Sequence, residues 1–315
     1  MNDPDNRHHQ SAPDSCGSIP GLAGEPAFVL ERGASAAIPL LIAVPHAGRC
    51  YSPSLVDGMR MPEAASLRLE DRHIDHVGQA LARSTGASLL VARAPRALID
   101  LNRSLDDMDW DMVADRSPEE GASGTVQGRR ARSGLGLVPR RLPGMGELWR
   151  GRIAGEDLDA RLREVHRPYH TALATTLESI RDRWGVALLI DLHSMPPIGP
   201  KRGAMRAPDF VLGDRFGASC DNALSSAALD TFAALGEVAS HNRPYAGGYV
   251  LDRHSCVRRN IHAVQIEVCR ATYLDRRLRE PGSGMAHVGA VLGAIVRRLS
   301  EELLGRARPL SEAAE

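Results

Sequence analysis

Runs of consecutive apolar residues, each about as long as one β-strand, recur along the chain and constrain its fold. Residues 40–44 read LLIAV, residues 186–190 read VALLI, and residues 263–268 read AVQIEV. A strand with one face in water alternates apolar and polar residues, whereas a strand buried on both faces is mostly apolar. The pattern predicts the α/β class, with a sheet that is buried on both faces between helices.

Strand-like and helix-like segments alternate along the chain. We expect strands at about 37–44, 87–92, 97–101, 186–194, 209–214 and 263–268, and helices at about 63–84, 156–184, 219–236 and 284–304. A disordered leader at 1–25, a single α/β domain at 26–304 and a polar tail at 305–315 make up the expected domain organisation. Residues 104–150 are rich in Gly, Ser, Pro and Arg, which indicates an excursion outside the core.

Charge and composition argue against two classes of partner. Lys+Arg and Asp+Glu number 39 each, so the chain lacks the long-range positive field of a dedicated nucleic-acid binder. No apolar run approaches the roughly 20 residues that a membrane-spanning helix needs. The five cysteines form no CxxC pair, and their odd number favours reduced thiols in the cytoplasm.

Polar and charged side chains gather where the predicted strands end. His46 follows the first apolar run and Pro45, and the run at 186–190 ends in Asp191 and His193. Two more of the predicted strand ends carry Asn102 with Arg103, and Glu267 with Arg270. Ligands of open α/β sheets bind at the carboxyl ends of the strands, so these residues predict a functional site. A single loop histidine would not predict a site, since an exposed loop position is then the better explanation.

Two histidines at strand ends require a third ligand if the site holds zinc, because hydrolytic zinc sites use three protein ligands. The stretch at 70–75 offers three carboxylates, Glu70, Asp71 and Asp75, near the start of a helix. Acidic residues also suit the positive end of a helix dipole, which explains any one of them without a metal.

Seven motifs resemble, in this order, those of the N-formylglutamate amidohydrolase family. They are VPHAG, EDRHIDHV, LIDLNRS, HRPYH, LIDLHSMPP, NRPYAGGYV and IHAVQIEVCRATYLD, and they extend over roughly residues 38–300. The resemblance implies a mixed, mostly parallel sheet sandwiched between helices, as in the similar zinc carboxypeptidases and aspartoacylases, with one Zn²⁺ per chain at the strand ends. It implies His46 and His193 as zinc ligands, with Asp71 as the third and Glu70 or Asp75 as alternatives.

The same resemblance implies the hydrolysis of an amide in a small N-acyl amino acid, with N-formyl-L-glutamate as the expected substrate. Glu267 would act as general acid and base, as the matching carboxylate does in the similar carboxypeptidases. A buried salt bridge to Arg270 or Arg258 is the structural alternative for Glu267. Arginine forks bind carboxylates bidentately, and the expected substrate-binding residues are Asn102, Arg103, Arg253 and Arg258.

Other interpretations remain open at this stage. The chain could hydrolyse a different N-acyl amino acid, or it could be a non-catalytic binding protein with the same fold. The histidines of HRPYH, His166 and His170, are interpreted as helix-packing groups, and Cys269 as an inert buried thiol. A serine hydrolase is disfavoured because no GxSxG motif occurs. The sequence does not predict an oligomeric state.

Overall fold

The computed structural model describes residues 16–31, 37–116, 129–200, 203 and 206–306. No helix in these ranges is long and apolar enough to cross a membrane. Residues 1–15 of the expected leader, residues 117–128 of the expected excursion and residues 307–315 of the expected tail lie outside the described residues.

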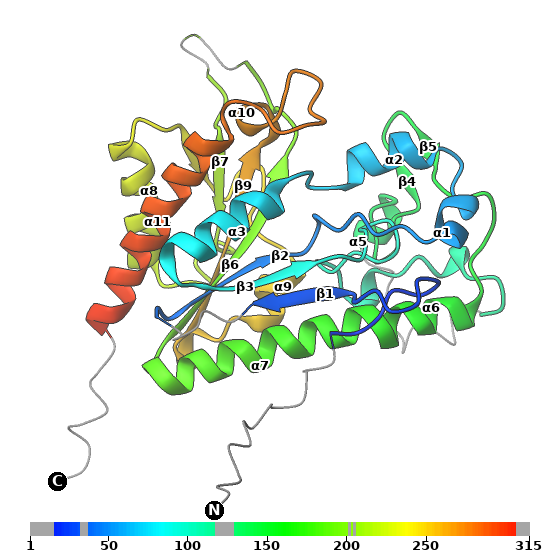
Figure 1. Ribbon diagram of the computed structural model, residues 1–315, viewed down its shortest axis with the longest axis horizontal. Coiled ribbons are helices and arrows are strands. Elements are labelled where there is room, and N and C mark those ends of the chain that lie inside the picture. The colour runs from blue at the N-terminus through cyan, green and yellow to red at the C-terminus, as the bar shows by residue number, and fades with distance from the viewer. Residues whose placement is uncertain (1–15, 32–36, 117–128, 201–202, 204–205, 307–315) are drawn as a thin grey trace, which may run out of the picture.

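A seven-stranded sheet forms the centre of the described structure, in the order β1-β3-β2-β6-β9-β7-β8 (Figure 1). The four central strands β3, β2, β6 and β9 are parallel, whereas β1 and β7 each pair antiparallel with a neighbour. The strands are β1 (Phe28–Glu31), β2 (Leu40–Val44), β3 (Ser88–Ala92), β6 (Ala187–Met195), β7 (Phe210–Gly213), β8 (Ala239–His241) and β9 (Ile261–Cys269). The predicted mixed, mostly parallel sheet is confirmed.

Helices surround this sheet, and a two-stranded sheet lies apart from it. The longer helices are α3 (Ile74–Thr85), α7 (Arg167–Trp184), α8 (Asn222–Ala234) and α11 (Met285–Arg306). The shorter ones are α1 (Pro53–Gly58), α2 (Pro62–Leu69), α5 (Arg129–Arg132), α6 (Gly155–Arg161), α9 (Tyr249–His254) and α10 (Arg270–Tyr273). A π-helical segment, Leu162–His166, joins α6 to α7. The small sheet consists of β4 (Arg141–Leu142) and β5 (Gly146–Glu147).

The two faces of the central sheet pack against different helices. On β6, Leu188, Ile190 and Leu192 belong to a buried cluster with side chains of α3, α8 and α11. Ala187 and Leu189, which alternate with them, belong to a second cluster with side chains of α7. Figure 1 shows α3, α8 and α11 on one side and α7 along the other. Burial on both faces explains why these strands read as continuous apolar runs.

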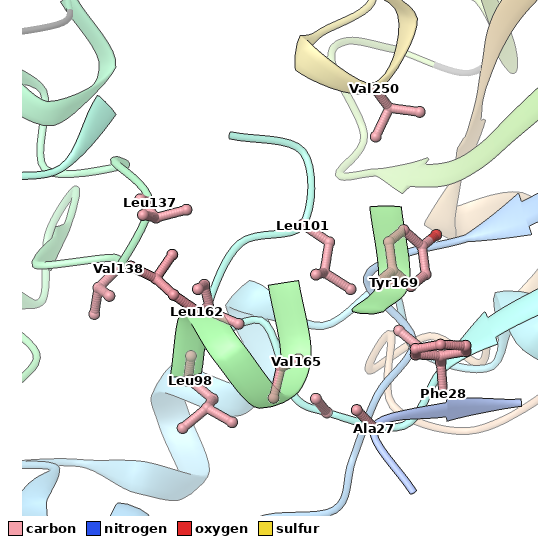
Figure 2. Packing of buried hydrophobic residues seen from close by; sticks show 14 of the residues in the cluster. Ala27, Phe28, Leu98, Leu101, Leu137, Val138, Leu162, Val165, Tyr169 and Val250 are labelled. Atoms are coloured by element: carbon pink, nitrogen blue, oxygen red, sulfur yellow. The ribbon is translucent and has the colours of Figure 1, made fainter. Parts of the chain in front are cut away.

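The second cluster extends beyond the sheet into the segments on either side of α6 (Figure 2). Leu137 and Val138 pack with Leu162 and Val165, which precede α7. Phe28 of β1 contacts Tyr169 of α7 edge to face, with ring centroids 5.7 Å apart. The described part of the predicted excursion at 104–150 thus differs from expectation. Many of its scattered apolar residues are buried, although the segment is rich in Gly and Arg.

Three further expectations require correction. Residues 97–101 form turns and loop and not a strand, because the amide of Asp100 donates to the carbonyl of Leu137 and not to a strand of the sheet. The helix expected at 63–84 is broken at 70–73, where His73 has a left-handed φ of 60°. Residues 16–25 are not a disordered leader, since Ile19 is buried and the Ser18 amide donates to the carbonyl of Glu164.

Candidate metal centre and active site

One face of β6 and β9 changes from apolar to polar along the strands. In the cross-strand register, Ala187 pairs with Ile261 and Leu189 with Ala263. The next two pairs on the same face are Asp191 with Gln265 and His193 with Glu267. All four of these polar side chains are buried. A buried polar patch is costly unless its groups are hydrogen-bonded or used, so this end of the face is a candidate site.

His46 lies beside this patch, in the loop that follows β2. Its Nε2 is 2.8 Å from Oδ1 of Asp100, a carboxylate that also accepts from Arg96 Nε at 2.8 Å. Gly48 lets the loop approach the next segment, because a Cβ on Gly48 would lie 2.0 Å from the carbonyl oxygen of Ala94. Close packing and the Asp100 contact together fix the imidazole.

His193 is held in the same manner by a different carboxylate. Its Nε2 is 2.8 Å from Oδ2 of Asp191, which lies two residues earlier on the same face of β6. Each histidine therefore directs Nε2 toward a buried aspartate. Metal-ligating histidines typically donate their second nitrogen to such a carboxylate, and this contact fixes the tautomer.

The other nitrogens of both rings face one oxygen of Asp71. Oδ2 of Asp71 lies 3.1 Å from Nδ1 of His193 and 3.6 Å from Nδ1 of His46. The second oxygen, Oδ1, accepts from Ser194 Oγ at 3.0 Å and from Arg270 Nη2 at 3.1 Å. Asp71 therefore directs one oxygen at the two imidazoles, while hydrogen bonds hold the other.

His46, Asp71 and His193 fit a metal ion. Their ligand atoms lie within 4.8 Å of one another, and all three residues are buried. Nδ1 of His46 has no hydrogen-bond partner among the described residues, which is costly for a buried nitrogen unless it binds a ligand. Two imidazoles and one carboxylate are a common ligand set for zinc in hydrolytic enzymes.

Buried charges shift the pKa values in this cluster in opposite directions. Burial raises the pKa of Asp71, but the hydrogen bond with His193 and the neighbouring His46 imidazole outweigh it and hold that pKa well below its usual value. Burial lowers the pKa of His193, but Asp191 and Asp71 outweigh it and raise that pKa well above its usual value. The cluster thus favours a positive charge between its carboxylates, which a divalent cation also supplies.

Glu267 lies across the strand pair from His193 and is 7% exposed. Burial, reinforced by nearby Asp71, raises its pKa to about 7, although His193 acts in the opposite direction. Its Oε1 accepts a hydrogen bond of 2.8 Å from Gln265 Nε2. Arg270 bonds Asp71 and Ser194 instead, and Arg258 lies exposed outside the cavity. The structural alternative for Glu267, a salt bridge to one of these arginines, is therefore wrong.

A cavity of about 580 Å³ opens onto these groups. His46, Asp71, His193 and Glu267 line it, as do the sequence-predicted residues Asn102 and Arg103. The Asn102 amide is 3.5 Å from His193 Nε2, and its oxygen accepts from the Val250 amide at 2.9 Å.

Four sequence candidates lie elsewhere. Arg253 donates to the Tyr249 hydroxyl, and neither it nor Arg258 lines the cavity. Glu70 pairs with Arg72 at 2.9 Å, and Asp75 pairs with Arg49 at 2.8 Å. Both carboxylates are therefore engaged away from the histidines.

Sequence reasoning missed Asp100 as a partner of His46, and it missed further cavity residues, among them Arg68, Arg96 and Gln265. A signal for Asp100 exists, because the tetrapeptide LIDL occurs at 98–101 and again at 189–192. Its aspartate is Asp191 in the second copy, beside His193, and Asp100 in the first. The repeat places one histidine-holding carboxylate in each copy.

A buried His–Asp–His cluster, backed by two carboxylates and lying beside a buried glutamate at strand ends, is typical of metal-dependent hydrolases. Comparison with known proteins agrees that the chain is a hydrolase. The family model of N-formylglutamate amidohydrolase matches residues 38–274, and the chain belongs to this family. It is accordingly a hydrolase that acts on an amide, and the resemblance found in the sequence motifs is confirmed.

Individual relatives support this membership. The chain is 34% identical to N-formylglutamate deformylase of Pseudomonas aeruginosa over 275 residues, which cover 86% of this chain and 94% of that protein. It is 33% identical to N-formylglutamate deformylase of Pseudomonas putida, over 85% of this chain and 92% of that protein. The crystal structure of N-formylglutamate amidohydrolase from Ralstonia eutropha superposes with a TM-score of 0.78 at 28% identity, covering 88% of this chain and 98% of that one.

Proposed function

We propose that the chain is a zinc-dependent enzyme that hydrolyses N-formyl-L-glutamate to formate and L-glutamate. The observation that carries the proposal is the geometry of His46, Asp71 and His193, in which three ligand atoms face one another while two aspartates hold the histidines from behind. The substrate follows from the two Pseudomonas relatives named above.

His46 Nδ1, His193 Nδ1 and Asp71 Oδ2 would hold one Zn²⁺ per chain. When bound, zinc lowers the pKa of a water molecule from about 16 to about 7 and polarises the carbonyl under attack. Arg270 and Ser194 keep the remaining oxygen of Asp71 in place through hydrogen bonds of 3.1 and 3.0 Å. These contacts leave Oδ2 as the oxygen directed at the histidines.

Glu267 is the proposed general acid and base. It takes the proton of the attacking water and transfers it to the nitrogen of the leaving amine, so that the amine departs neutral. A carboxyl with a pKa of about 7 can both accept and donate a proton near neutral pH. Its position opposite His193 places it beside the ligand cluster.

Asn102 and Arg103 are proposed to bind the α-carboxylate of the substrate. Arg103 is anchored by hydrogen bonds to the carbonyls of Leu135, at 3.0 Å, and Asn102, at 2.6 Å. Asn102 contacts His193, so this pair lies close to the reacting amide. Arg253 and Arg258 are not part of the proposal, because neither lines the cavity.

We propose the cytoplasm as the compartment, on the ground that the five cysteines are free thiols in the structure. The partner is the small N-acyl amino acid alone. No nucleic-acid or membrane partner forms part of the proposal.

Metal analysis and a substrate panel test the proposed function. Purified protein should hold about one zinc ion per chain, and chelation should abolish the release of formate from N-formyl-L-glutamate. N-acetyl and N-succinyl derivatives of glutamate, with N-formyl derivatives of other amino acids, complete the panel. Chelator-resistant hydrolysis would contradict the role of zinc, whereas faster turnover of an acetyl or succinyl derivative would correct the acyl group.

A further inference from the structure

Among the described residues, five arginines line the cavity, and one of them differs from the others. Four bond to neighbouring residues: Arg96 to Asp100, Arg103 to the carbonyl of Leu135, Arg215 to Asp252, and Arg270 to Asp71. Arg68, in the last turn of α2, forms no hydrogen bond or ion pair with any described residue. Its guanidinium is therefore available to a ligand in the cavity.

The backbone that carries Arg68 is fixed to the candidate metal centre. Arg270, which holds Asp71, also donates from Nη1 to the carbonyl of Leu67 at 3.3 Å. The amide of Asp71 donates to the carbonyl of His46 at 2.9 Å. The chain is thus tied down on both sides of Arg68, while its side chain is exposed at the cavity. A charged group on a fixed backbone can recognise a ligand with little loss of backbone entropy.

Charge complementarity points to an anion. The proposed substrate carries two carboxylates, and Asn102 with Arg103 accounts for one of them. Asn102 contacts His193, close to the reacting amide, which suits the α-carboxylate because that group is attached one carbon from the amide nitrogen. The second carboxylate lies two methylene groups further along the side chain. Among the arginines of the cavity, Arg68 is the one with no protein acceptor to satisfy it among the described residues.

We infer that Arg68 binds the side-chain carboxylate of the substrate and so selects dicarboxylic N-acyl amino acids over neutral ones. The inference rests on the proposed function. It adds the residue that distinguishes glutamate from a neutral residue of the same size. A structural alternative exists, because an arginine in the last turn of a helix also complements the helix dipole.

Two substitutions and two substrates test the inference. N-formyl-L-glutamate and N-formyl-L-glutamine have nearly the same size but differ by one negative charge. Arg68→Gln should raise KM for the glutamate compound about ten- to a hundredfold, which corresponds to the loss of one charge-assisted hydrogen-bonded pair. KM for the glutamine compound and kcat for both should change little. Arg68→Lys should restore only part of the loss, because an ammonium lacks the planar fork.

Arg83→Gln is the matched control. Arg83 is the basic residue in the last turn of α3, exposed like Arg68, and it does not line the cavity. The two Gln variants should have similar melting temperatures, because each loses only the contribution of one arginine to a helix end. Arg83→Gln should leave both KM values unchanged.

The outcomes separate this inference from the proposed function. If the wild type hydrolyses N-formyl-L-glutamate and Arg68→Gln raises KM for both substrates equally or for neither, the inference is wrong and the proposed function stands. If Arg68→Lys matches the wild type, attraction over a distance explains the effect and direct binding is refuted. A zinc-loaded wild type that hydrolyses neither compound overturns both proposals.

Discussion

Asp100 and Asp191 hold the two histidines of the candidate metal centre from behind, and each makes a contact of 2.8 Å with Nε2 of its histidine. We predict that Asp100→Asn weakens zinc binding about ten- to a hundredfold, because the neutral amide accepts the imidazole hydrogen bond less strongly and no longer fixes the tautomer. Competition with a chromophoric chelator measures the dissociation constant.

Asp214→Asn is the control for this experiment. Asp214 is another buried carboxylate that accepts from a histidine, with 2.8 Å between its Oδ2 and His241 Nε2, but it does not line the cavity. Its substitution should lower the melting temperature without changing the affinity for zinc. Equal affinities in all three proteins would show that Asp100 does not support the metal site.

Glu267 permits a sharper test, because its described hydrogen bond is to Gln265 and it forms no ion pair with Arg270. Glu267→Gln keeps the volume and allows a hydrogen bond with Gln265 to remain once one amide flips. Turnover should fall at least about a hundredfold, while zinc content and KM change little. A variant that remains active but melts early would instead make Glu267 a structural residue.

At the scale of the elements, the loop after β2 sets the position of His46. We predict that Gly48→Ala destabilises the protein by about 1–3 kcal/mol, because its Cβ would overlap the carbonyl of Ala94. The loop cannot easily move aside, since the Cys50 amide donates to the carbonyl of Arg93 at 3.1 Å. Urea unfolding gives the change in free energy, and zinc affinity should fall with it.

Gly151→Ala provides the comparison. A Cβ on Gly151 would meet no described atom within 4 Å, and the backbone of Gly151 is not left-handed. This variant should unfold at nearly the wild-type urea concentration. If Gly48→Ala matched it, the close approach to Ala94 would not position the loop.

Several elements and site residues are predictable from sequence because local pattern determines them. The run before Asp191 is apolar on both faces, so a central strand is the interpretation that buries it, and His193 then shares a face with Asp191. Residues 98–101 repeat the same LIDL tetrapeptide yet form turns. Their conformation depends on which neighbours are free to pair, and that information is not local. The contact of Asp100 with His46 was missed for the same reason.

At the scale of the whole molecule, a histidine cluster connects α7 and α9 with the loop that carries Arg103. His170 Nδ1 is 2.9 Å from His254 Nε2, and His166 Nε2 donates to the carbonyl of Arg103 at 3.0 Å. All three histidines are buried. The interpretation of His166 and His170 as helix-packing groups agrees with these contacts, and the cluster couples the packing of α7 to the cavity wall.

Burial keeps this cluster neutral and thereby makes stability depend on pH. Burial, reinforced by Arg253 and His166, lowers the pKa of His254 to about 3, and burial with the neighbouring His166 lowers the pKa of His170 well below its usual value. In the unfolded chain both histidines titrate near 6.5. At a pH between the folded-state pKa and the unfolded-state pKa of either histidine, the unfolded chain binds more protons than the folded one. A lower pH therefore favours unfolding.

We predict that the free energy of unfolding falls as pH decreases below about 6.5, and that His254→Gln reduces this dependence. One histidine that stays neutral in the folded state contributes roughly 1.4 kcal/mol per pH unit between about pH 5.5 and 4. Zinc release at low pH acts in the same direction, but it is common to both proteins and cancels in their difference.

Urea unfolding of the wild type and the variant at pH 7, 5.5 and 4.5 measures that difference. At pH 7 the variant should have the lower free energy of unfolding, because His170 loses its partner. The difference between the two free energies of unfolding should narrow as the pH falls. A difference that stays constant over these pH values would mean that His254 accepts a proton in the folded protein.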